Sequence, residues 1–225
     1  MDGRTHAARR RGIGARMSKV INFFPTPVII DRLPEFEALN AALENTIRAR
    51  REEDEGVALS NRGGWQSKHN FETWGGEAGK AVIAHASALA TAHVESVRKS
   101  GWSIDSWANI SGPGHSNALH VHGGSFWSCV YYVRAGAEGG KLVLHDPRMP
   151  ALRMHAPGLR FKNAGPDVRA ELQPENGMMV LFPAWLGHSV EAWQGEGDRI
   201  SVAMNIRSQP WAPKGKANLI AGKTK

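Results

Sequence analysis

The chain has 225 residues, a single cysteine and a formal net charge of +7. This length fits one domain with a sizeable core, and one cysteine excludes an internal disulfide and is typical of a reducing cytoplasm. No apolar run reaches the roughly 18 residues that a membrane span needs, and the basic N-terminus lacks the apolar segment of a secretory signal. We therefore predict a cytoplasmic protein without membrane association.

The positive charge is concentrated at the two ends of the chain. Residues 1–19 contribute +5 and residues 214–225 contribute +4 to the total of +7, which leaves −2 for the segment between them. We expect a basic, disordered extension at 1–19, a single domain over 20–213 and a basic, flexible tail at 214–225. Met17 is a natural start, so the residues before it do not enter the fold argument. Because the basicity belongs to the tails, nucleic acid is not favoured as a partner.

The first part of the chain has helical periodicity. The segment 23–31, "FFPTPVIID", is a short apolar strand whose two prolines favour the edge of a sheet. Residues 34–51 form an amphipathic helix, residues 60–76 a glycine-rich structured loop, and residues 77–100 a second helix. The apolar stripe of the first helix consists of Phe36, Leu39, Leu43 and Ile47.

After Gly101 the pattern changes to short strands separated by turn residues. Such a series is typical of a β-sandwich or barrel. We predict a mainly β protein with N-terminal helices over one face, built as a double-stranded β-helix (a cupin-like jelly-roll). The predicted strands are 106–111, 117–122, 126–133, 141–145, 159–162, 168–172, 177–183, 188–193 and 199–206.

Two histidines lie two residues apart in the alternating run 117–133. In a strand, Ala118, His120 and His122 point to the same face. A third histidine, His188, belongs to a later strand. Imidazole suits iron, copper, zinc and nickel, and two ligands from one strand with a third from a distant strand make an ordinary facial arrangement. We therefore predict a metal site at the three histidines.

An arginine and a hydroxyl share one face of the last predicted strand. Arg199 and Ser201 alternate there with apolar residues that point to the opposite face. Core packing does not require an arginine at this position, whereas a bound carboxylate does, because guanidinium pairs with carboxylate bidentately. The pattern predicts an anion site near the metal.

With these residues, the sequence resembles the 2-oxoglutarate/Fe(II)-dependent oxygenases, which use a double-stranded β-helix and a His-x-Asp/Glu…His triad. It is most similar to a bacterial subfamily of 2OG-Fe(II) oxygenases with a His-x-His motif. The resemblance covers about residues 20–207. It rests on "FFPTPV", "SNRGGWQS", "SWANI", "HVHGGSFWSCVYYV", "GGKLVLHDPR", "VLFPAWLGHSV" and "RISVAMNI".

The resemblance implies a site for 2-oxoglutarate. Arg199, supported by Ser201, is expected to bind the C5 carboxylate, while the C1 carboxylate and the ketone chelate the iron. Asn109 and Tyr132 are candidates for a further hydrogen bond to the keto acid, and a structural role is equally open for both.

The resemblance also makes His120 the first iron ligand and His188 the distal one, but His122 stands where relatives carry a carboxylate. Three interpretations follow. We prefer the first, in which His122 is the third ligand. In the second, the iron has only two protein ligands and an open position takes water or a halide; in one version His122 is the first ligand and Gly124 the vacant position. In the third, a carboxylate such as Asp146 completes the triad.

The function implied is an Fe(II)- and 2-oxoglutarate-dependent dioxygenase that hydroxylates a small-molecule or amino-acid-like substrate with release of succinate and CO2. The alternatives are a cupin-like metal-binding module and a three-histidine dioxygenase that does not use 2-oxoglutarate. The placement of Arg199 and Ser201 favours the first. A homodimer is compatible with the exposed edges of a jelly-roll.

Overall fold

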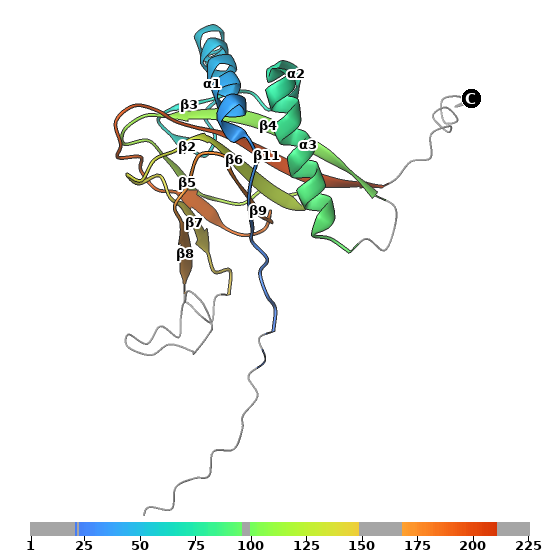
Figure 1. Ribbon diagram of the computed structural model, residues 1–225. Coiled ribbons are helices and arrows are strands. Elements are labelled where there is room, and N and C mark those ends of the chain that lie inside the picture. The colour runs from blue at the N-terminus through green and yellow to red at the C-terminus, as the bar shows by residue number, and fades with distance from the viewer. Residues whose placement is uncertain (1–20, 22, 96–99, 149–167, 211–225) are drawn as a thin grey trace, which may run out of the picture.

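A computed structural model describes residues 21, 23–95, 100–148 and 168–210 (Figure 1). The predicted extension 1–19, the tail 214–225 and the strand 159–162 lie outside these residues.

Two antiparallel sheets form the body of the protein. Their strands are β1 (Ile29–Arg32), β2 (Asn61–Arg62), β3 (Trp65–Gln66), β4 (Ser100–Ser111), β5 (Ser116–His120), β6 (Trp127–Arg134), β7 (Leu142–His145), β8 (Arg169–Leu172), β9 (Met178–Pro183), β10 (His188–Val190) and β11 (Arg199–Pro210). The six-stranded sheet has the order β1-β9-β6-β11-β4-β3, and the five-stranded sheet has the order β2-β5-β10-β7-β8. Of the predicted strand 23–31, only the part from Ile29 onward belongs to a strand, β1, which lies at a sheet edge as predicted; Pro25 and Pro27 precede it.

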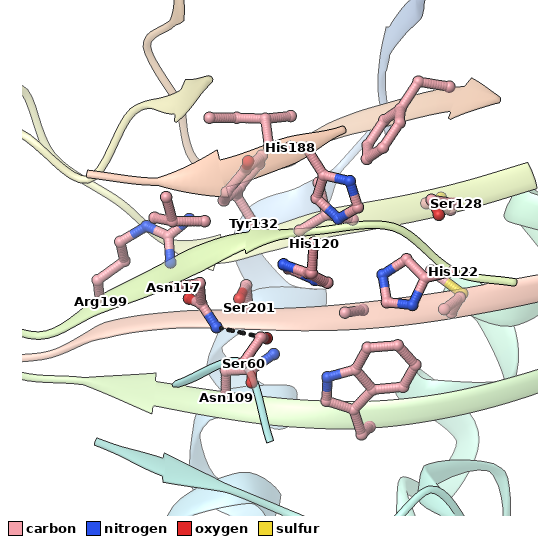
Figure 2. Close-up of a pocket in the computed structure, with 18 residues that line it drawn as sticks. Ser60, Asn109, Asn117, His120, His122, Ser128, Tyr132, His188, Arg199 and Ser201 are labelled. Carbon is pink, nitrogen blue, oxygen red and sulfur yellow. Dashed lines mark hydrogen bonds between the residues drawn. The ribbon is translucent and has the colours of Figure 1, made fainter. Parts of the chain in front are cut away.

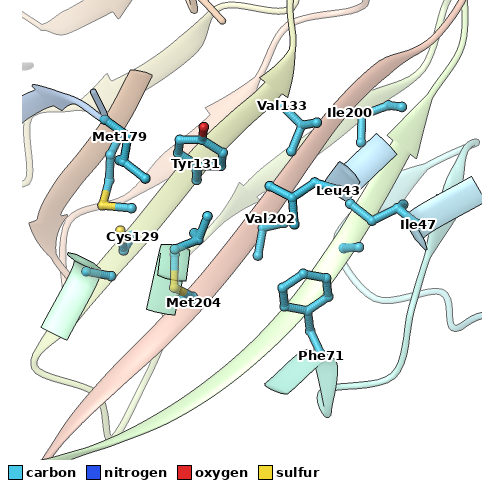
Figure 3. Packing of buried hydrophobic residues seen from close by; sticks show 14 of the residues in the cluster. Leu43, Ile47, Phe71, Cys129, Tyr131, Val133, Met179, Ile200, Val202 and Met204 are labelled. Atoms are coloured by element: carbon cyan, nitrogen blue, oxygen red, sulfur yellow. The ribbon is translucent and has the colours of Figure 1, made fainter. Parts of the chain in front are cut away.

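Helices cover the outer face of the six-stranded sheet: α1 (Phe36–Glu53), the short α2 (Phe71–Trp74) and α3 (Gly76–Ala92). Helix α1 buries Leu43 and Ile47, and α3 buries Val82, Ala86 and Ala90 at helical spacing. Each fully buried aliphatic side chain of Leu or Val size contributes roughly 1.5–3 kcal/mol. These stripes belong to the same apolar cluster as the buried face of β11 (Figure 3), which is Ile200, Val202, Met204 and Ile206.

The two predicted helices differ in outcome. The helix expected over 34–51 is confirmed as α1, but the second was predicted too long, because α3 ends at Ala92 rather than near residue 100. Ser100 and Gly101 instead begin β4 and pair with Pro210 and Gln209 of β11. Twelve residues of strand pairing satisfy the backbone there, a long-range gain that local periodicity does not show. The predicted loop 60–76 also contains β2, β3 and α2.

One buried polar link fixes α1 on the sheet. The Tyr131 hydroxyl of β6 donates to Asn40 Oδ1 at 2.6 Å, and Asn40 Nδ2 donates to the Val133 carbonyl oxygen at 2.7 Å. Asn40 therefore satisfies two groups of β6 that have no access to water. A buried polar group that loses its partner destabilises a fold by about 1–3 kcal/mol.

We expect Asn40→Ala to lower the free energy of unfolding by about 3 kcal/mol, because it leaves the Tyr131 hydroxyl and the Val133 carbonyl without partners. Tyr131→Phe leaves only Asn40 Oδ1 unpaired, so its expected cost is smaller, about 1 kcal/mol. Urea denaturation measures both values. Equal costs for the two variants would contradict the assigned role of Asn40.

Candidate metal centre

The pairing of β5 with β10 places two histidines opposite each other. His120 ends β5 and His188 begins β10, and the register pairs them directly. His122 follows two residues later, where its backbone N–H donates to the Ala184 carbonyl oxygen at 3.0 Å. The three ring centroids lie 4.3 to 5.1 Å apart, and one ring nitrogen from each lies within 4.8 Å of the others (Figure 2).

Backbone carbonyls orient two of the three rings. His120 Nδ1 lies 2.7 Å from the Ala118 carbonyl oxygen, and His188 Nδ1 lies 2.9 Å from the Leu186 carbonyl oxygen. A carbonyl oxygen only accepts, so each Nδ1 carries the proton and each Nε2 keeps a free lone pair. This is the tautomer in which metal-binding histidines are usually held. The His122 ring lies 5.8 Å from Trp107 between centroids.

A bulge in β5 changes the predicted alternation. His120 pairs with His188 and Asn117 pairs with Val190, so β5 has one more residue between these pairs than β10 has. The extra residue brings Asn117 as well as His120 to the cavity wall, while the Ala118 N–H donates to the Ser60 carbonyl oxygen. The expectation that Ala118 shares the facing side with the histidines is therefore not met. Bulges of this kind often re-aim side chains next to functional sites.

Burial keeps His122 and His188 neutral. Loss of solvent and the neighbouring imidazoles lower the pKa of His188 to about 3 and the pKa of His122 to about 4. Both rings are therefore uncharged at neutral pH, and a neutral imidazole is the form that binds a metal.

The anion-binding residues predicted from the sequence line the same cavity. Ser201 of β11 pairs with Asn109 of β4 on one side and with Tyr132 of β6 on the other. Arg199 is 3% exposed, and its guanidinium carbon lies 5.1 Å from the Tyr132 ring centroid. Gly140 permits a close approach here, because a Cβ on it would lie 3.0 Å from Arg199 Cδ.

Arg199 is a buried cation without an acidic partner among the residues that the structure describes. Its Nε forms no hydrogen bond within that part of the chain, and burial lowers the pKa of its guanidinium. Both observations fit a bound carboxylate, which would satisfy the donors and restore the stability of the charged form.

Asp146 does not join the histidine cluster. Its carboxylate accepts hydrogen bonds from Arg148 Nη2 at 2.6 Å and Nε at 2.9 Å, and it is absent from the described residues that line the cavity. The structure therefore brings together the set that we preferred, His120, His122 and His188, and their role as ligands stays a prediction.

The cavity, about 550 Å³ including its open mouth, also has lining residues that the sequence did not single out. Ser128 shares a strand face with Tyr132, and Trp107 shares one with Asn109, so period-two alternation could have indicated both. Asn117 depends on the bulge and Ser60 on a loop, and local sequence carries no signal for either.

The fold is a jelly-roll of the double-stranded β-helix class, with clustered histidines that can hold a metal ion and a buried arginine in one cavity. Residues 105–205 match the family described as "Putative 2OG-Fe(II) oxygenase", so the predicted resemblance to the 2OG-Fe(II) oxygenases is confirmed for this region. Fe(II) and 2-oxoglutarate, the predicted cofactors, are the two that the family description names, and the histidine cluster is a group that can hold iron. A comparison with curated protein sequences finds no match.

Solved structures share the fold at low sequence identity. A prolyl-4-hydroxylase from Pseudomonas putida is 19% identical, with a TM-score of 0.56 over 79% of this chain and 91% of its own. A Trichoplax adhaerens prolyl hydroxylase, in complex with a peptide fragment of hypoxia inducible factor, is 13% identical, with a TM-score of 0.57 over 80% and 83%. HygX from Streptomyces hygroscopicus, with nickel and 2-oxoglutarate bound, is 11% identical, with a TM-score of 0.54 over 81% and 83%. The predicted double-stranded β-helix is confirmed.

We expect the metal-free protein to lose stability as the pH falls below about 6.5, the ordinary pKa of histidine. Because the pKa of His188 is lowered on folding, the unfolded chain binds the proton more readily, and the free energy of unfolding decreases as the pH falls. His188 alone should lower the free energy of unfolding by about 2 kcal/mol between pH 7 and pH 5. Urea denaturation with a chelator measures this, and His188→Gln should show a shallower decrease. An equal decrease in both proteins would contradict the assignment.

Metal titration separates His122 from Asp146 as the third ligand. By calorimetry with Co(II), we expect His188→Ala and His122→Ala each to weaken binding by about 100-fold, since each removes one of three ligands. Asp146→Asn should bind like the unaltered protein, because its carboxylate is held by Arg148. Loss of affinity in Asp146→Asn with none in His122→Ala would contradict the three-histidine site.

Proposed function

We propose that this protein is an Fe(II)- and 2-oxoglutarate-dependent dioxygenase that hydroxylates a small-molecule or amino-acid-like substrate, with release of succinate and CO2. The observation that carries the proposal is Arg199, a buried guanidinium whose Nε has no partner in the described chain, in the same cavity as three histidines. The family match supports the oxygenase class.

Each group in the cavity has a separate task. His120, His122 and His188 would hold the iron through three neutral nitrogens. Arg199 would bind the far carboxylate of the keto acid, and Ser201 would donate a hydrogen bond to it. The chemistry that Fe(II) and 2-oxoglutarate supply when bound is the activation of dioxygen coupled to decarboxylation of the keto acid.

Further polar and apolar side chains complete the pocket. Tyr132 and Asn109 flank Ser201 across the sheet, and this register supports a hydrogen bond from either of them to the keto acid. Burial raises the pKa of Tyr132, which keeps its hydroxyl protonated and able to donate. Phe182 lies against His188, with ring centroids 4.8 Å apart, and excludes water from that side of the metal ligands.

The two alternative functions do not account for the buried arginine. A cupin-like metal module, or a dioxygenase that binds its substrate directly on three histidines, has no need for a buried guanidinium in the metal cavity. Only a cosubstrate with a second carboxylate explains both features together.

The proposal also includes the cellular location and the oligomeric state of the protein. No helix in the described part of the chain is long and apolar enough to cross a membrane. A cytoplasmic location and a homodimer follow only from the sequence arguments above.

We expect anaerobic addition of Fe(II) and then 2-oxoglutarate to produce a weak visible charge-transfer band. Arg199→Ala should weaken 2-oxoglutarate binding by about 100-fold, because it removes a charged, bidentate hydrogen-bond donor. Arg199→Lys should give an intermediate value, since it keeps the charge and loses the planar fork. Arg134→Ala, which removes an exposed arginine of the neighbouring strand, is the matched control and should leave the band unchanged. Iron binding without such a band would contradict the proposal and favour the alternatives.

A further inference from the structure

The cavity contains no acidic side chain among the described residues that line it. Its permanent charge is the Arg199 guanidinium, which is buried. Two aspartates elsewhere in the described fold are already paired: Asp146 with Arg148, and Asp105 with Arg207. Among the described residues that line the cavity, no carboxylate therefore balances a cation inside it.

The charges of the cofactors do not balance in this cavity. An imidazole that binds a metal is neutral, so the three histidines add no charge. The ferrous ion and Arg199 bring three positive charges, whereas 2-oxoglutarate brings two negative ones. One positive charge remains, which a carboxylate at the position of His122 would have cancelled. An uncompensated charge away from water is costly, and the site gains stability from a further anion.

An unpaired hydroxyl lines the same cavity. Ser128 is 3% exposed and lines the cavity, and its Oγ forms no hydrogen bond within the described part of the chain. Figure 2 shows Ser128 and His122 toward one end of the cavity and Arg199 toward the other, and the strand register agrees, because Ser128 pairs with Asn205 of β11, far along that strand from Arg199. A buried hydroxyl without a partner is uncommon, and it can donate to an anion. This end of the cavity is therefore separate from the predicted carboxylate site at Arg199.

We propose that the loaded site binds a second, singly charged anion at the end formed by His122 and Ser128, and that this anion is a carboxylate of the substrate. The proposal rests on the proposed function, since the excess charge arises only with iron and 2-oxoglutarate in place. Trp107 lies near His122 and adds an apolar wall. The substrate class is therefore a monocarboxylate with an apolar body. A halide from solution has the same charge and is the other source of an anion.

The test uses the protein loaded with Co(II), whose visible absorption responds to nearby ligands, and saturated with 2-oxoglutarate. Sodium acetate is titrated in one arm and sodium chloride in the other, with ionic strength held constant by perchlorate. We expect acetate to produce a saturable spectral change that persists when 2-oxoglutarate is raised tenfold. Ser128→Ala should weaken acetate binding by about fivefold. His122→Asp, which supplies the absent negative charge, should weaken it by at least about tenfold.

The outcomes separate this inference from the proposed function. Binding of Co(II) and 2-oxoglutarate without a response to acetate overturns the inference and leaves the proposed function standing. Failure to bind 2-oxoglutarate overturns the proposed function itself. A response that 2-oxoglutarate abolishes places acetate at Arg199 and overturns the second site, and a response to chloride alone overturns the carboxylate. If His122→Asp does not bind Co(II), unchanged acetate affinity in Ser128→Ala overturns the inference.

Discussion

The buried guanidinium of Arg199 is the constraint on which the rest of this structure depends. A charge removed from water costs several kcal/mol unless it is paired, and the described chain offers Arg199 no acidic partner. The opposite face of the same strand offsets this cost, since Ile200 and Val202 belong to the apolar cluster between the sheet and its helices. Pairing on both sides of β11 adds further support. Apolar packing on one face of β11 thus offsets the cost of the buried charge on its other face.

The three histidines differ in how their rings are held. Two of them are fixed by carbonyl oxygens two residues earlier in the chain, and these contacts select the tautomer with a free Nε2. His122 lies beyond the end of β5, and its ring is positioned by its neighbours His120, His188 and Trp107. If His122 is the third ligand, as we predict, its neutral ring would leave a ferrous site more positive than one with a carboxylate, which would affect the further ligands that the cavity favours.

The fold alone does not define the reaction. The solved structures that share it are 11 to 19% identical to this chain, and their names include different enzymes, so their substrates cannot be transferred. What narrows the function here is the chemistry of the cavity: three imidazoles, a buried cation, and a hydroxyl without a partner in the described chain. These features come from residues on both sheets, and the sheets keep them at fixed positions.

The sequence by itself determined the class of fold, the helix-covered face, and the histidines and the arginine that the cavity brings together. Strand alternation is a local property, so the shared faces of Arg199 with Ser201 and of Tyr132 with Ser128 could be predicted without a structure. The tertiary structure decided the features that strand alternation does not predict. The end of α3 was fixed by the long pairing of β4 with β11, and the bulge in β5 turned Asn117 into the cavity. The distance between His122 and His188 likewise depends on contacts between segments far apart in the chain. The ion pair of Asp146 with Arg148 depends on side-chain geometry. A one-dimensional pattern contains neither.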